Sequence, residues 1–157
     1  MLPDHLRERS IAAAVEDFDR SAVLTGKYEK DELTLEIAAP KIVSVCGFLK
    51  YDQKFVRLSS LAGVDRYPAE PRFEVVYHLH SIERNYRVRL KCRIRGADPV
   101  IESVTPVWRS ANWYERETFD LFGIRFLNHP DLRRILLPDD WEGHPLRKDY
   151  PITGQRI

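Results

Sequence analysis

The stretch from Trp108 to Pro151 reads WRSANWYERETFDLFGIRF (108–126) and then LNHPDLRRILLPDDWEGHPLRKDYP (127–151), and it decides the fold. The first part is typical of one capped helix. The second part cannot form a helix or a regular strand, because proline recurs at positions 130, 138, 145 and 151. It still carries apolar side chains that a disordered tail would lack, namely Leu132, Ile135, Leu136, Leu137, Trp141, Leu146 and Tyr150. The sequence therefore predicts an ordered, irregular C-terminal arm (residues 126–157) that lies on a surface, part of which belongs to another protein.

The helix before the C-terminal arm is predicted over Trp113–Phe122. Asn112 is a favourable N-cap, and Glu115 stands at the third helical position, which is a capping-box arrangement. Gly123 follows the last turn, as a C-terminal cap should. Arg116, Glu117 and Asp120 lie on the side away from the apolar face. We expect the carboxylates of this helix to pair with arginines of the C-terminal arm and to hold its irregular backbone in place.

The same residues are the candidates for a partner interface and its structural anchors: Trp113, Glu115, Arg116, Glu117, Asp120, His129, Arg133, Arg134, Trp141, Arg147, Lys148, Asp149 and Tyr150. Paired carboxylates can also perform general acid–base catalysis. That chemistry needs a nucleophile or base in a pocket, and this region offers no activated Ser, Cys or Lys. Ion-pair scaffolding is the favoured interpretation, and no catalytic residue is assigned.

Residues 1–125 are predicted to form an α+β domain. Hydrophobic periodicity indicates helices over 4–18 and from Pro40 to Asp52, and strands over 21–28, 33–37, 55–64, 73–82 and 86–94. The last strand alternates most clearly, with apolar residues on one face and basic residues on the other. The predicted fold is a mixed, largely antiparallel sheet of about five strands with helices packed on it, followed by the extended C-terminal arm.

Composition narrows the function classes. The chain has 157 residues and a formal net charge of +1, which gives no reason to expect a nucleic-acid partner. No secretory signal is expected at the charged N-terminus, and the apolar run Ile42–Leu49 is far shorter than the ~20 residues that span a bilayer. A role at a membrane would therefore be indirect, through partners. Cys46 and Cys92 have no CxxC spacing and are expected to be free thiols.

The sequence gives weaker signals for cofactor and metal sites. Glu74, His78 and His80 share one face of a predicted strand and could ligate zinc, which would make the chain a small metalloenzyme; the alternative is a polar layer beside the helix over 113–122. His129 and His144 could carry protons but are expected to hydrogen-bond irregular backbone. Two cysteines cannot hold an iron–sulfur cluster alone, and no GxGxxG or GxxxxGK motif indicates a nucleotide.

The stretches ERETFDLFGIRF (115–126) and HPDLRRILLPDDWEGHPLRKDYP (129–151) resemble the C subunit of the respiratory proton-pumping NADH–quinone oxidoreductase, complex I, the family of the mitochondrial thirty-kilodalton subunit. Weaker similarity extends back through LSSLAGVDRYP (58–68) and RFEVVYHLHSI (72–82). Residues 1–50 match in arrangement more than in detail.

The resemblance implies a non-catalytic structural subunit in the peripheral arm of the complex, on the cytoplasmic side of the cell inner membrane. Such a subunit braces the subunits of the quinone module, chiefly the D subunit and its neighbours, the B and I subunits. FMN and iron–sulfur clusters belong to partner subunits, and NADH and quinone are substrates of the whole complex, which couples electron transport to proton translocation. The chain also resembles the separate form of this family more than the form fused to the D subunit. An equivalent subunit of a membrane-bound hydrogenase, or of a dehydrogenase with another electron donor, is the alternative.

Overall fold

A five-stranded mixed sheet forms the centre of the computed structural model, which describes residues 10–153. Its strands lie in the order β1 (Val23–Glu29), β2 (Glu32–Ile37), β5 (Tyr86–Ile94), β4 (Phe73–Ser81) and β3 (Arg57–Asp65). The β2–β5 pair is parallel and the other neighbours are antiparallel. The predicted fold class is therefore confirmed. All five strands lie within two or three residues of their predicted bounds.

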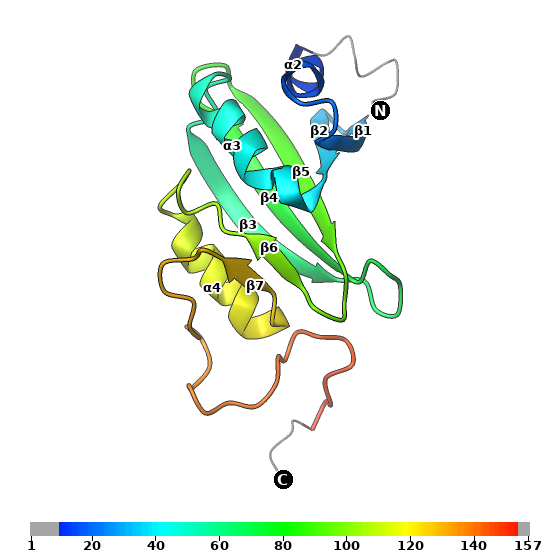
Figure 1. Ribbon diagram of the computed structural model, residues 1–157, viewed down its shortest axis with the longest axis vertical. Coiled ribbons are helices and arrows are strands. Elements are labelled where there is room, and N and C mark those ends of the chain that lie inside the picture. The colour runs from blue at the N-terminus through cyan, green and yellow to red at the C-terminus, as the bar shows by residue number, and fades with distance from the viewer. Residues whose placement is uncertain (1–9, 154–157) are drawn as a thin grey trace.

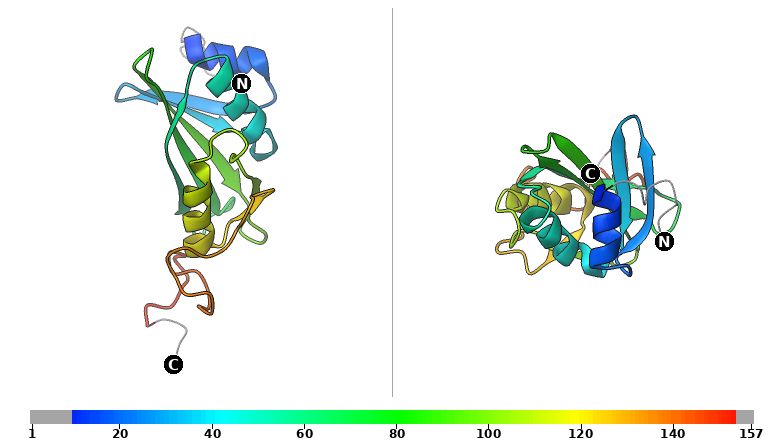
Figure 2. Two further views of the ribbon diagram at one scale, coloured as in Figure 1. Left: turned by 90° about the vertical axis from the view of Figure 1, so that its left-hand side faces the viewer. Right: turned by 90° about the horizontal axis from the view of Figure 1, so that it is seen from above.

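Helices cover one face of this sheet, as Figures 1 and 2 show. They are α2 (Ser10–Phe18), α3 (Ile42–Tyr51) and α4 (Ala111–Phe122), with the short 3-10 turn η1 (Ala39–Lys41) leading into α3. Pro40 lies in that turn and not in the α-helix itself. Residues 4–9 of the predicted first helix lie outside the described residues. The helices and the sheet enclose one apolar core, in which Cys46 and Cys92 are buried free thiols as predicted.

Strand alternation divides the sheet into a helix-covered face and an open face. In β5, Val88, Leu90 and Cys92 are buried, while the intervening arginines and Lys91 lie on the open face. Gly63 of β3 packs on the side chains of Thr118 and Phe122 in α4 and is paired with Val75 of β4.

His78 and His80 lie an odd number of residues from Val75, so they point to the open face. The predicted polar layer beside the helix over 113–122 is therefore wrong. These two histidines lie on the side of the sheet away from α4.

A second, two-stranded parallel sheet was not predicted. It pairs β6 (Val100–Glu102) with β7 (Arg125–Leu127), and three residues are too few for an alternation to be recognised. The predicted boundary between residues 125 and 126 lies inside β7, so the C-terminal arm begins as a paired strand. From Asn128 to the last described residue, 153, the chain forms no helix or strand, and in Figure 1 this segment, drawn orange to red, runs past the end of α4.

Candidate partner interface at the C-terminal arm

The start of α4 differs from the prediction. The helix begins at Ala111, and Ser110, which precedes it, makes no capping hydrogen bond through its side chain. The capping box of Asn112 and Glu115 is therefore wrong. The end is as predicted: Gly123 has φ +72°, and a Cβ at this position would lie 2.6 Å from the His144 ring. Glycine is required here both by the left-handed backbone and by the close approach of the C-terminal arm.

Asp120, on α4, is the centre of the contacts between the helix and the C-terminal arm. Its fully buried Oδ2 accepts hydrogen bonds from the backbone N–H groups of Ile135, Leu136 and Leu137, at 3.0, 2.7 and 2.9 Å. Its Oδ1 accepts a hydrogen bond from Nη1 of Arg134 at 2.7 Å. Burial raises the pKa of this carboxyl, but the amide donors and Arg134 outweigh that effect, and the net shift is downward. Asp120 is thus a fully bonded anion.

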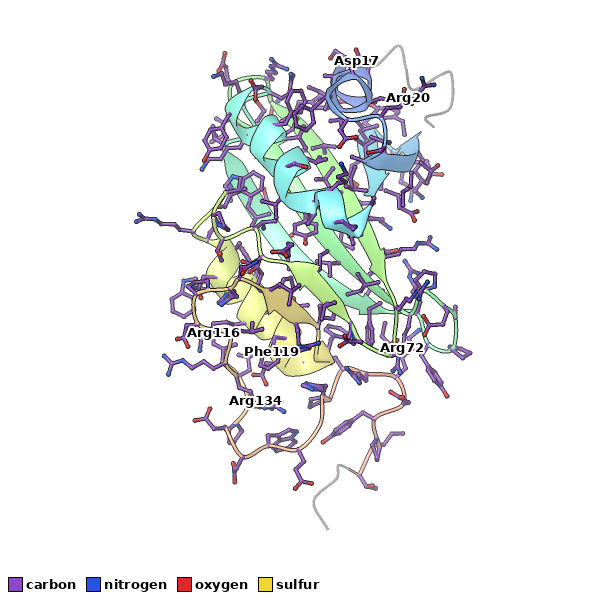
Figure 3. All side chains as sticks on the ribbon, viewed as in Figure 1. Asp17, Arg20, Arg72, Arg116, Phe119 and Arg134 are labelled. Atoms are coloured by element: carbon purple, nitrogen blue, oxygen red, sulfur yellow. The ribbon has the colours of Figure 1, made fainter. Side chains whose placement is uncertain are left out.

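Arg134 closes a loop of the C-terminal arm around this carboxylate. While Nη1 binds Asp120, Nη2 donates to the carbonyl oxygens of Trp141 and Gly143 at 3.0 and 2.9 Å. His144 contacts the Asp120 carbonyl oxygen through Nδ1 at 2.9 Å. The predicted pairing of a helix carboxylate with an arginine of the C-terminal arm is therefore present, and Arg134 lies beside α4 in Figure 3.

Arg116 reverses the expected direction of pairing, because a helix arginine binds the backbone of the C-terminal arm. Its Nε donates to the Arg133 carbonyl at 3.1 Å and its Nη2 to the Arg134 carbonyl at 3.0 Å. The same guanidinium lies over the ring of Trp113, which is 61% exposed. Arg116 therefore orders the chain just before the segment that Asp120 binds.

The far end of the C-terminal arm is bound to the sheet domain at the candidates Lys148 and Asp149. Their partners, Arg72 and Asp65, were not revealed by the sequence patterns. Arg72 binds Asp65 with two hydrogen bonds of 2.9 Å and also binds Asp149. Asp65 Oδ2 accepts in addition the backbone N–H of Lys148 at 2.8 Å. Asp149 lies 77 positions from Arg72 in the chain, so no local pattern could reveal the pair. Figure 3 shows Arg72 on the side of the molecule away from Arg116 and Arg134.

Arg147 makes contacts that do not involve a carboxylate. Its Nε donates to the Phe122 carbonyl at 2.6 Å, and its guanidinium lies over the Phe73 ring at 5.1 Å. Beside it, the backbone N–H of Leu146 donates to the Leu121 carbonyl. Hydrogen bonds to two carbonyl groups therefore join the C-terminal arm to the last turn of α4, and a cation–π contact joins it to β4.

Glu115 does not pair with the C-terminal arm's arginines as expected. It is fully buried, and its oxygens accept hydrogen bonds from the Ser103 hydroxyl at 2.6 Å and the Val104 N–H at 2.7 Å. Burial raises the pKa of Glu115 to about 7. His129 lies 3.8 Å away, accepts the Asp131 N–H at Nδ1 and contacts the Asn112 carbonyl through Nε2. His129 and His144 both hydrogen-bond irregular backbone, as predicted.

The contacts of Asp120, Arg134 and Arg116 form a clamp between α4 and the C-terminal arm. The remaining candidates take little part in it. Glu117 is exposed, Arg133 pairs with Asp131 between two exposed side chains, and the Tyr150 hydroxyl reaches the Glu142 carbonyl only at 3.5 Å. Trp141 contributes its carbonyl oxygen, and Lys148 its backbone N–H. A role of these residues at a partner interface stays a prediction.

Apolar side chains of the C-terminal arm remain on the surface. Leu136 is 61% exposed, Leu146 52% and Ile135 36%. The amides of Ile135 and Leu136 donate to Asp120, while their side chains stay exposed. The clamp therefore holds irregular backbone whose apolar side chains are exposed, and an exposed apolar surface is typical of an interaction site.

The zinc alternative has no support among the described residues. Glu74 contacts Lys91 and Arg66, and His78 contacts Ser60 and Arg89. Within residues 10–153, no group of three His, Cys, Asp or Glu side chains is placed to hold a metal ion. The same range contains no helix with the length and apolar character that crossing a membrane would require.

A family model described as the 30 kDa subunit of respiratory-chain NADH dehydrogenase matches residues 35–156. The chain belongs to this family. It is 47% identical to the NADH-quinone oxidoreductase C subunit of Geobacter sulfurreducens over 147 residues, which covers 93% of this chain and 90% of the relative. It is 53% identical to the second C subunit of Rhizobium etli over 118 residues, 74% of this chain and 63% of the relative. The resemblance seen in residues 115–151 is thereby confirmed.

Two solved structures of related proteins share the fold of this family member. One is a trypsin-resistant fragment (1-134) of Nqo5, with a TM-score of 0.67 and 29% identity over 76% of this chain and 97% of that chain. The other is a chain of the membrane-bound sulfane sulfur reductase, an archaeal respiratory membrane complex, with a TM-score of 0.79 and 26% identity over 94% of this chain and 87% of that chain. The second match extends over most of the C-terminal arm.

Proposed function

We propose that this chain is a non-catalytic structural subunit in the peripheral arm of a proton-pumping NADH–quinone oxidoreductase, on the cytoplasmic side of the cell inner membrane. It braces partners that resemble the D, B and I subunits, which hold the quinone module. FMN and iron–sulfur clusters belong to partner subunits. The observation that carries the proposal is the clamped C-terminal arm, whose exposed Ile135 and Leu136 are fixed in place by Asp120 and Arg134.

The state of the two buried acids on α4 favours a structural role over acid–base chemistry. Both oxygens of Asp120 accept hydrogen bonds within the chain, and its pKa is lowered, so it holds its charge for Arg134 and the amides. Glu115 is fully buried between Ser103 and Val104. A catalytic carboxyl must reach its substrate, and neither group is exposed to one in this chain.

The alternative assembly is a related membrane complex that uses another electron acceptor or donor. The similarity to a chain of the membrane-bound sulfane sulfur reductase supports this alternative, because the match covers 94% of this chain. In that case the chain's role as a brace is unchanged and the redox partners differ. Identification of the proteins that copurify from gently solubilised membranes distinguishes the two complexes.

The test of the brace is Leu136→Glu, with Ile82→Glu as the matched control. Leu136 is 61% exposed on the C-terminal arm, and Ile82 is 63% exposed in the turn between β4 and β5. A charge at an apolar contact should reduce the amount of complex recovered with the tagged chain by about tenfold or more, since a central contact contributes about 2 kcal/mol. Thermal unfolding of the isolated chain should be unchanged in both variants.

The same preparation tests whether the chain takes part in chemistry. The complex that Leu136→Glu does assemble should oxidise NADH with quinone at the normal rate per complex. Recovery of the full amount of complex with its turnover abolished would contradict the structural role.

A further inference from the structure

The open face of the sheet neutralises most of its own charge. Its cations and carboxylates form ion pairs with N–O distances within 3.4 Å: Lys27–Glu29, Arg89–Glu32, Lys91–Glu74, Arg66–Glu74 and Arg93–Glu36. The larger hollow on this face, of about 540 Å³, is lined largely by these paired side chains. It therefore offers little net charge to a ligand.

One row of side chains is the exception. Arg57 of β3 lies directly opposite His80 of β4, which lies directly opposite Arg87 of β5. Directly opposed residues of antiparallel strands point to the same face, with Cβ atoms roughly 5 Å apart. Both arginines are exposed, and neither makes an ion pair or hydrogen bond with another of residues 10–153. Two guanidinium groups thus flank one imidazole, and Glu32, the carboxylate that lines the same hollow, is already paired with Arg89.

The imidazole between them lacks a partner as well. Nε2 of His80 is covered and makes no hydrogen bond within the described chain. A covered polar atom without a partner costs about 1–3 kcal/mol, so such atoms usually indicate a missing partner. The neighbouring row shows the contrast, because His78 contacts Ser60 at 3.0 Å and Arg89 at 3.2 Å. The lack of hydrogen-bond and ion-pair partners is therefore confined to His80 and the two arginines beside it.

A hollow of about 450 Å³ lies over this row and is lined by its three side chains. The hydroxyl-bearing Ser59 and Ser60 line it as well, as do His78 and Glu32. It is large enough to admit a phosphate group, with room for the remainder of a monoester. The arginine side chains are long and exposed, so they can turn outward to admit a ligand and then close over it. His80 would gain a partner in the same movement.

We propose that the Arg57–His80–Arg87 row binds a phosphate dianion, either inorganic or as a monoester. Guanidinium groups bind phosphate oxygens bidentately, and two of them balance two negative charges. A phosphate dianion presents four oxygens to these three donor groups and balances both guanidinium charges, whereas a monocarboxylate balances only one. The row lies on the open face, away from the C-terminal arm, so the site is independent of the proposed brace.

The test is a titration of the full chain with inorganic phosphate at constant ionic strength, followed by the NMR signals of the His80 ring, which His80→Gln identifies among the five histidines. A saturable shift of these signals is expected. Arg57→Ala and Arg87→Ala should each raise the apparent Kd for phosphate by about tenfold or more, because each removes a bidentate, charge-assisted contact. Arg95→Ala is the control: it removes the same charge just beyond the opposite end of β5 and should change Kd less than twofold.

Two further arms identify the anion and its source. Acetate at the same ionic strength should not reproduce the shift. Vesicles of phosphatidylcholine with and without phosphatidic acid distinguish a lipid headgroup from soluble phosphate: cosedimentation that requires both phosphatidic acid and Arg57 supports the headgroup, and saturable binding of phosphate without cosedimentation supports a soluble ligand. The proposal is overturned if phosphate gives no saturable shift, if acetate matches it, or if Arg95→Ala weakens binding as much as Arg57→Ala.

Discussion

At the scale of single residues, α4 carries two buried acids whose pKa values shift in opposite directions. Asp120 and Glu115 are both fully buried, five positions apart in the helix. Asp120 accepts hydrogen bonds from three amides and a guanidinium, which more than offset the cost of burial. Glu115 has one hydroxyl and one amide donor, and burial dominates. The difference comes from the donors: Asp120 has the Leu137 amide, then Arg134 and two further amides, whereas Glu115 has only two neutral donors.

Glu115→Gln should change how stability depends on pH. The folded-state pKa of Glu115 is raised from 4.5 to about 7, so its contribution is fully present below about pH 4.5 and is lost as pH rises toward 7. The loss amounts to at most about 3 kcal/mol, since one pKa unit corresponds to about 1.4 kcal/mol. Glutamine keeps the shape and can bond both Ser103 and Val104. Urea unfolding between pH 5 and 8, chosen to bracket this pKa, is the measurement.

Histidines titrate in the same window, so the decisive quantity is the difference between the wild-type and Glu115→Gln curves. The free energy of unfolding of the variant should fall less steeply as pH rises. Parallel curves would show that Glu115 ionises in the folded protein as it does in the unfolded chain.

At the scale of elements, the contact between α4 and β3 depends on the absence of a side chain at Gly63. A Cβ there would lie 2.8 Å from Cδ2 of Phe122 and 3.0 Å from Cγ2 of Thr118. These atoms are well inside normal contact distance, so either the helix or the Phe122 ring would have to move. The close approach brings the Asp120 end of α4 against the sheet.

Gly63→Ala should therefore lower the free energy of unfolding by about 1–3 kcal/mol, the usual cost of overpacking. Gly47→Ala is the matched control, since nothing lies within 4 Å of a Cβ at this position of α3. That change should stabilise the protein by up to about 1 kcal/mol, because alanine is the better helix former. Denaturant unfolding of both variants checks the pair, and equal effects would refute the packing argument.

Sequence patterns predicted the elements better than the contacts between them. The alternation of β5 identified its buried face, and Gly123 identified the end of α4, because both signals are local. Glu115 was misassigned because capping-box spacing is local too, whereas its true partners, Ser103 and Val104, follow the short strand β6. Arg134 could be proposed as a partner of the helix, but Arg72 could not, since only the folded sheet brings it to Asp149.

At the scale of the whole molecule, the C-terminal arm is fastened at two separated places. Asp120 and Arg134 hold it beside α4, and Arg72 holds it near the ends of β3 and β4 through Asp65 and Asp149. Burial raises the pKa of Asp65, but the bonds from Arg72 and two amides outweigh it and leave the pKa well below its usual range. The second fastening is thus a bridged pair of carboxylates sharing one guanidinium.

Arg72→Ala should release the far end while leaving the Asp120 clamp intact. Trypsin cleaves after Arg147 and Lys148, and its rate follows the population of the open segment. Loss of one charge-assisted pair of about 1.5 kcal/mol predicts an increase of about tenfold. Arg84→Ala, which removes an exposed arginine bonded to Gln53, is the control and should leave the rate unchanged. A rate in Arg72→Ala equal to that of the wild type would mean that Asp149 does not fasten the C-terminal arm.

The three consecutive amides that end on Asp120 also limit how another protein can recognise this segment. Ile135, Leu136 and Leu137 already donate their backbone N–H groups to Asp120. A partner chain therefore cannot bind this segment by β-augmentation, which would need those N–H groups for backbone hydrogen bonds. Selectivity must come from the shape of the projecting Ile135 and Leu136. Substitutions that alter branching at these positions would therefore change the choice of partner without disturbing the protein that displays them.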